Sequence, residues 1–139
     1  MIKIAVIDGQ GGGIGSLTVK RLRAEFRDSI EITALGTNAV ATTSMMKAGA
    51  DKGASGENAI IWNASRVNII TGPVSIMMPN AMLGELTSKM AEAVSSSPAR
   101  KMLLPLNQEQ VEIIGAIKEP LPHLIDALIQ QLKEIIKNV

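Results

Sequence analysis

The fold is decided by one stretch near the N-terminus, Ile2-Lys3-Ile4-Ala5-Val6-Ile7-Asp8-Gly9-Gln10-Gly11-Gly12-Gly13-Ile14-Gly15-Ser16. Residues 2–7 are mostly apolar and rich in β-branched side chains, as in a buried central strand. Residues 13–27 have the periodicity of a helix. A strand, a glycine-rich loop and a helix in this order suit a phosphate, because glycines let the backbone approach the ligand and the first-turn N–H groups attract the anion. The stretch therefore predicts an anionic ligand at residues 8–16.

Strand and helix patterns alternate along the rest of the chain. Strands are expected at residues 2–7, 30–35, 66–71, 101–106 and 111–114, and helices at residues 13–27, 39–48, 57–64, 81–94 and 120–137. Residues 49–56 have the composition of a mobile loop. The alternation predicts an α/β fold, a three-layer Rossmann-like parallel sheet of about five strands with helices on both faces, in the strand order 3-2-1-4-5. The length of 139 residues suits one such domain over residues 1–139.

Ligands of such sheets bind beyond the C-terminal ends of the strands, where the strand order reverses. The loops expected at this edge are residues 8–15, 36–38, 72–80 and 107–110. Asn80 is the preferred ligand candidate after the third expected strand, ahead of Glu85. The full set of candidate ligand-binding residues is Asp8, Gly9, Gln10, Gly11, Gly12, Gly13, Ile14, Gly15, Gly36, Thr37, Asn38 and Asn80.

Several of these candidates also have a purely structural interpretation. Asp8 either binds a cation or a ribose hydroxyl, or it accepts hydrogen bonds from the N–H groups of its own loop and fixes the turn. Thr37 or Asn38 is placed to cap the following helix, and Asn80 to cap the helix expected from residue 81. The sequence leaves both interpretations open for each residue.

Composition excludes several kinds of chemistry. The chain has no cysteine and no tyrosine, and His123 is its single histidine, so we expect no metal site. The net charge of +1 favours neither a nucleic-acid nor a membrane partner. No apolar run approaches the ~20 residues of a membrane span, and the N-terminus has the pattern of a strand rather than of a signal peptide. These features predict a cytoplasmic protein.

Gly9, Gly13, Ile14 and Gly15 spell G-x-x-x-G-I-G, which resembles the cofactor loop of the short-chain dehydrogenases. The resemblance covers about ten residues and implies NAD or NADP as the cofactor, with these four residues against it. The catalytic Tyr-x-x-x-Lys of that family has no counterpart here, because the chain lacks tyrosine. The acidic residue that holds the adenosine ribose is also missing after the second expected strand, where Thr37 and Asn38 stand. NAD and NADP therefore both stay open.

The chain as a whole resembles a small bacterial family of unknown function, through residues 7–15, 36–38, 72–73 and 83–85. This resemblance implies a Rossmann-like nucleotide-binding fold and no particular reaction. We expect a sensing or regulatory protein that binds a nucleotide or a phosphorylated small molecule and forms a homo-oligomer, most simply a dimer. One alternative is a small enzyme that holds a phosphorylated substrate near Asp8, Asn38 and Asn80 at a subunit interface. The other is a structural subunit whose glycines only allow tight packing.

Overall fold

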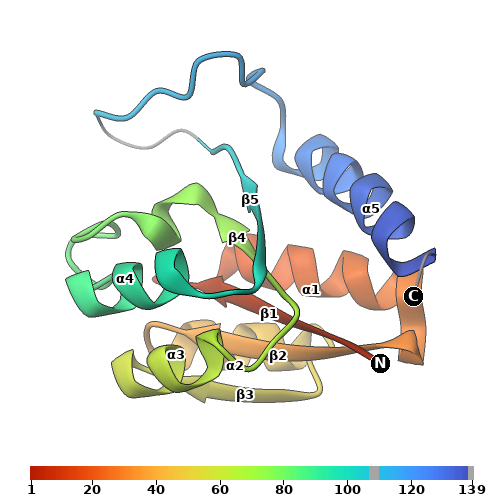
Figure 1. Ribbon diagram of the computed structural model, residues 1–139, viewed down its shortest axis with the longest axis horizontal. Helices are drawn as coiled ribbons and strands as arrows, with labels where there is room; N and C mark the ends of the chain where they lie inside the picture. Colours follow the sequence, from red (N-terminus) through yellow and green to blue (C-terminus); the bar gives the residue numbers. More distant parts are fainter. Residues whose placement is uncertain (107–109, 138–139) are drawn as a thin grey trace.

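Five parallel strands form the centre of the computed structural model, which describes residues 1–106 and 110–137 (Figure 1). Their order in the sheet is β3-β2-β1-β4-β5, which confirms the predicted α/β fold and the numerical order 3-2-1-4-5. The segments that fill this order differ from the expectation, because residues 52–55 form the outer strand and the strand expected third, at residues 66–71, pairs with the first strand instead. The elements are β1 (Ile2–Asp8), α1 (Gly13–Phe26), the 3-10 turn η1 (Arg27–Ser29), β2 (Ile30–Gly36), α2 (Ala39–Lys47), β3 (Lys52–Ser55), α3 (Glu57–Ala64), β4 (Ile69–Pro73), the 3-10 turn η2 (Val74–Met77), α4 (Ser88–Ser96), β5 (Arg100–Leu104) and α5 (Leu121–Lys137).

The register of the central strands brings the predicted ligand loops to one edge. Strand β1 pairs with β2 along its whole length, from Ile2 beside Ile30 to Asp8 beside Gly36. On its other side β1 pairs with β4, with Val6 beside Thr71. Because all the strands are parallel, the loops that follow β1, β2 and β4 meet at the C-terminal edge of the sheet.

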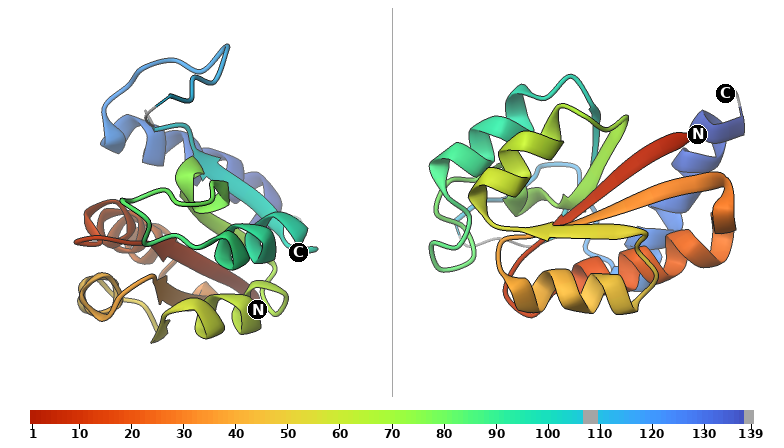
Figure 2. Two further views of the ribbon diagram at one scale, coloured as in Figure 1. Left: turned by 90° about the vertical axis from the view of Figure 1, so that its left-hand side faces the viewer. Right: turned by 90° about the horizontal axis from the view of Figure 1, so that it is seen from below.

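Helices cover both faces of the sheet and enclose two apolar cores (Figure 2). Helices α1, α2 and α5 pack on one face, where Leu22, Met45 and Ile125 are completely buried. Helices α3 and α4 and the turn η2 pack on the other face, through Ile60, Val94 and Ile76. The predicted three layers are therefore present. Among the described residues, no helix combines the length and the apolar content that a membrane crossing requires.

The segment expected to be a mobile loop, residues 49–56, contains strand β3 at the edge of the sheet. Its residues Lys52 to Ser55 pair with residues 33–36 of β2. This expectation was wrong because an edge strand is held by backbone hydrogen bonds and needs no apolar pattern. Three of its four residues are exposed, so the strand has no hydrophobic pattern in the sequence.

The fifth strand expected at residues 111–114 is not in the sheet, and the prediction of a strand there was wrong. Residues 110–120 instead form an extended connection between β5 and α5 that projects from the body of the protein (Figure 1). Val111, Ile113 and Ile114 are exposed, so their apolar alternation does not face the core. Of the loop expected at residues 107–110, residues 107–109 lie outside the described residues.

The helix expected at residues 81–94 begins only at Ser88. Met82, Leu83 and Gly84 have φ values of 59°, 57° and 90°, which a right-handed helix does not allow. Thr87 caps α4 instead, because its side chain accepts a hydrogen bond from the N–H of Met90. The residues from 78 to 86, which we call the Met78–Leu86 loop, are therefore free to reach across the C-terminal edge of the sheet.

We expect Thr71→Val to stabilise the protein. Thr71 is completely buried in β4, and its hydroxyl has no hydrogen-bond partner in the described part of the chain. An unsatisfied buried hydroxyl costs about 1–3 kcal/mol, and valine has nearly the same shape. Urea denaturation should show a free energy of unfolding that is higher by about 1 kcal/mol. A less stable variant would instead mean that the hydroxyl has a water or ligand partner.

Candidate functional site

The glycine loop links the end of β1 to the start of α1 at the centre of the C-terminal edge. Gly12 adopts a left-handed conformation, with φ 73°, at the N-cap of α1. The N–H of Gly12 donates to the carbonyl oxygen of Gly9 at 2.9 Å and closes the turn. The first turn of α1 therefore starts directly beside β1, as a phosphate-binding loop requires.

The Asp8 carboxylate fixes the shape of this loop. One of its oxygens accepts the N–H of Gly9 at 2.8 Å, and the other accepts the N–H of Gly15 at 2.7 Å. The residue is only 4 % exposed. Asp8 therefore has the structural role expected for it, because it accepts hydrogen bonds from the N–H groups of its own loop. Burial raises the pKa of Asp8 above its ordinary value, and the nearby charge of Glu85 adds to this, whereas the N–H groups of Gly15 and Gly9 lower it.

The five glycines of the loop fall into two classes. A Cβ at Gly9, Gly12 or Gly15 would lie within 3 Å of neighbouring atoms, so an added side chain would force those atoms to shift. A Cβ at Gly11 or Gly13 would meet no atom within 4 Å, and neither residue has a positive φ. Packing and backbone conformation therefore explain three of the glycines and leave Gly11 and Gly13 without an intramolecular reason.

The loop after β2 is tied to the glycine loop. Asn38 caps α2, as expected, because its side-chain oxygen accepts the N–H of Ala41 at 2.8 Å. Its amide nitrogen donates to the carbonyl oxygen of Gln10 at 3.0 Å. The N–H of Thr37 donates to the carbonyl oxygen of Asp8 at 3.0 Å. A Cβ at Gly36 would clash with the α2 turn, so this glycine also serves packing.

Glu85 lies closer to these loops than Asn80, the candidate that sequence analysis preferred. One carboxylate oxygen of Glu85 accepts hydrogen bonds from the Thr37 hydroxyl at 2.6 Å, the Gln10 N–H at 2.8 Å and the Asn38 side-chain amide at 2.8 Å. The Thr37 hydroxyl and the Gln10 N–H, with the Asn38 amide, hold the pKa of Glu85 below its ordinary value. No local signal in the sequence places Glu85 here, because 48 residues separate it from Thr37 along the chain.

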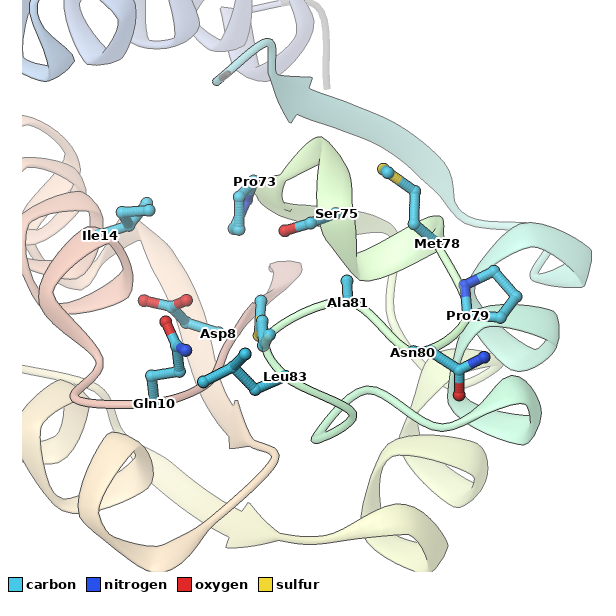
Figure 3. A pocket seen from close by; sticks show the side chains of 11 residues that line it. Asp8, Gln10, Ile14, Pro73, Ser75, Met78, Pro79, Asn80, Ala81 and Leu83 are labelled. Atoms are coloured by element: carbon cyan, nitrogen blue, oxygen red, sulfur yellow. The ribbon is translucent and has the colours of Figure 1, made fainter. Parts of the chain in front are cut away.

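A pocket of about 490 Å³ opens between β1 and β4, where the strand order reverses (Figure 3). This volume lies in the range of small-molecule sites. The Ser75 hydroxyl points into the pocket although the residue is only 1 % exposed, and no hydrogen bond joins it to another described residue. The Asn80 side chain, at the far end, points away from Asp8. The lining residues are Asp8, Gln10, Ile14, Pro73, Ser75, Met78, Pro79, Asn80, Ala81, Met82 and Leu83.

The electrostatics of the pocket come from carboxyl groups and backbone dipoles. Asp8 is the only charged residue among the described residues that line it. Positive potential comes instead from the N-terminus of α1. Nowhere among residues 1–106 and 110–137 do three or more His, Asp or Glu side chains gather as they would around a metal ion.

Comparisons with known proteins give a family and a fold. The family model "Domain of unknown function (DUF3842)" matches residues 3–137. A solved structure, a dodecameric FMN-dependent UbiX-like decarboxylase from Escherichia coli O157:H7, has a similar fold with a TM-score of 0.57. The two chains share 15 % identity, and the similarity covers 95 % of this chain and 94 % of the other. No curated protein matches the sequence.

The raised pKa of Asp8 predicts how stability depends on pH. A carboxyl group whose pKa is higher in the folded than in the unfolded state adds most stability below the unfolded value, about 3.9, and loses this contribution as pH rises through the folded value. Wild type should therefore lose stability relative to Asp8→Asn between about pH 3 and pH 7. Urea denaturation of both proteins across this range measures the difference. A wild-type advantage that grows with pH would show that the hydrogen bonds from Gly9 and Gly15 outweigh burial.

Proposed function

The chain belongs to the DUF3842 family, a domain of unknown function. From the site itself, we propose that the protein binds a nucleotide-type ligand in the pocket between β1 and β4. In this proposal the phosphate lies against Gly11 and Gly13 at the N-terminus of α1. The uncharged part of the nucleotide enters the pocket lined by Ile14, Ser75 and Met78. The binding role is sensing or regulatory, and the proposal includes no reaction.

Gly11 and Gly13 carry this proposal. They are the two loop glycines that face open space, so a ligand that approaches the backbone closely is the remaining physical reason for glycine there. Phosphate oxygens bind in this way at the first turn of a helix, where N–H groups point outward and the helix dipole attracts negative charge. Packing alone, the interpretation as a structural subunit, accounts for Gly9, Gly12 and Gly15 and not for these two.

The surroundings of the loop are compatible with an anion despite the nearby carboxylate. Both oxygens of Asp8 already accept backbone N–H groups, and its raised pKa reduces the cost of protonation when an anion binds. The Ser75 hydroxyl, which points into the pocket, supplies a further donor at its wall. Without a lysine or arginine in the described lining, the phosphate relies on neutral donors, which favours modest affinity.

The fold also suggests which nucleotides to test first. The similar solved structure is described as FMN-dependent and shares the fold over nearly the whole chain, which supports FMN as a probe. The G-x-x-x-G-I-G loop supports NAD and NADP. One observation supports the alternative that the protein is an enzyme: Asp8 is buried at the edge of the pocket and its pKa is raised.

Gly11→Ala and Gly13→Ala should weaken binding without unfolding the protein. Each added methyl group meets no protein atom within 4 Å but stands where the phosphate would lie. We expect the dissociation constant for FMN or NAD to rise about tenfold or more, which corresponds to about 1.4 kcal/mol. Isothermal titration calorimetry measures binding, and thermal unfolding without ligand measures stability.

Gly53→Ala on β3 is the matched control, because its Cβ would lie 2.8 Å from a Thr42 methyl group, away from the loop. It should lower the midpoint of unfolding and leave the dissociation constant unchanged. Binding that is unaffected by both loop substitutions would contradict the proposed position of the phosphate. If FMN, NMN, NAD and NADP all fail to bind or stabilise wild type, the proposed function is wrong.

We also propose that the protein self-associates through residues 110–120. This segment exposes Ile114 to 92 % and Ile117 to 72 %, together with Val111 and Ile113. Such a cluster of exposed apolar side chains is typical of an interaction surface. The similar solved structure is described as dodecameric, which supports an oligomer without giving its geometry.

Ile114→Asp combined with Ile117→Asp should therefore dissociate the oligomer. Both side chains are exposed, so the folded protein loses little packing, whereas an interface would have to bury two charges. Light scattering coupled to size-exclusion chromatography should show the mass of a dimer or larger oligomer for wild type and of a monomer for the variant. A monomeric wild type at high concentration would contradict the proposal.

A further inference from the structure

The Met78–Leu86 loop closes one side of the glycine loop and leaves the other side open. Glu85 joins the loops after β1 and β2, because one carboxylate oxygen accepts hydrogen bonds from Gln10, Thr37 and Asn38. It therefore occupies the C-terminal end of β2. In dinucleotide-binding folds this end of the second strand holds the ribose of the adenosine half.

Met82 fills the space next to Glu85. A Cβ on Gly9 would lie 2.5 Å from the Met82 sulfur, 2.5 Å from the Thr37 hydroxyl and 3.1 Å from the carboxylate oxygen of Glu85. The side of Gly9 toward which a Cβ would point is thus covered by protein. In contrast, Gly11 and Gly13 are open, as is the pocket on the β4 side.

The backbone conformation that places Met82 and Glu85 is energetically unfavourable, so the rest of the fold must stabilise it. Asn80, Met82 and Leu83 all have φ between 57° and 68°, in the left-handed region that side chains disfavour. Hydrogen bonds from the N–H of Asn80 to the carbonyl oxygen of Leu86, at 2.7 Å, and from the N–H of Glu85 to the carbonyl oxygen of Met82, at 3.1 Å, hold the loop. The three hydrogen bonds to the Glu85 carboxylate then anchor it over Gly9.

We propose that Glu85 and Met82 make the site selective for mononucleotides, because they occupy the position that the second half of a dinucleotide needs. This inference rests on the proposed function and narrows its ligand class to one phosphate-bearing nucleotide, held in the β1–β4 pocket. A dinucleotide has to displace the Met78–Leu86 loop before both of its halves fit. An additional 2′-phosphate on the second half would also face the negative charge of Glu85.

Two matched pairs of ligands test this selectivity on the wild-type protein, FMN with FAD and NMN with NAD. Each pair shares one half, so the ratio of dissociation constants isolates the effect of the second half. We expect the mononucleotide to bind at least about tenfold more tightly than its dinucleotide. The selectivity would be wrong if a mononucleotide and its dinucleotide bound with equal affinity. The proposed function would still stand if Gly13→Ala weakened the binding of that pair. If a dinucleotide binds and neither mononucleotide does, the selectivity is wrong and the proposed function stands. If none of these nucleotides binds, both proposals fail.

The double variant Met82→Ala, Glu85→Ala should narrow the ratio to about threefold or less, chiefly through tighter binding of the dinucleotide. Glu85→Gln is the matched control, since the amide oxygen still accepts hydrogen bonds from Thr37 and Gln10 and fills the same volume. It should keep most of the wild-type ratio. A folded double variant with an unchanged ratio would contradict the role of these two side chains. If the double variant does not fold, the wild-type ratios decide the question.

Discussion

The rest of the C-terminal edge depends on one interaction, the pair of hydrogen bonds that the buried Asp8 carboxylate accepts from Gly9 and Gly15. Together they span the glycine loop and clamp the first turn of α1 against the end of β1. Because the carboxylate takes N–H groups that an external anion would otherwise bind, it also determines where a ligand can go. The hydrogen bonds to Asp8 hold the loop in place, whereas Gly11 and Gly13 face open space.

A second carboxylate divides the same edge into a closed and an open half. Glu85 accepts hydrogen bonds from the donors beside β2, whereas the Ser75 hydroxyl points into the pocket beside β4. The two carboxylates have opposite electrostatic surroundings, since burial raises the pKa of Asp8 and hydrogen bonds lower that of Glu85. Because its pKa is lowered, Glu85 carries a negative charge beside β2. Because the pKa of Asp8 is raised, the side of the edge next to β4 is more tolerant of an anion.

The regular elements could be predicted where burial imposes a pattern. Strand β1 is largely buried, and helices α1 and α5 each bury one apolar face, so all three show the expected periodicity. Strand β3 could not be predicted, because its contribution is backbone pairing at an edge. The prediction of a strand at residues 111–114 was wrong because the apolar side chains of this segment are exposed and do not pack in the core. The helix expected from residue 81 failed because left-handed residues precede Ser88.

The sequence by itself determined the α/β class and the glycine loop, because local periodicity and glycine content show where strands and helices alternate and where the backbone turns. It also identified Asp8 and Asn38, because the loop N–H groups that Asp8 accepts and the helix N–H that Asn38 caps lie within seven residues of them along the chain. Only the tertiary structure decided which glycines serve packing and which face a ligand. It also brought Glu85 and Ser75 to the loop, since contacts across tens of residues depend on how strands and loops converge at one edge.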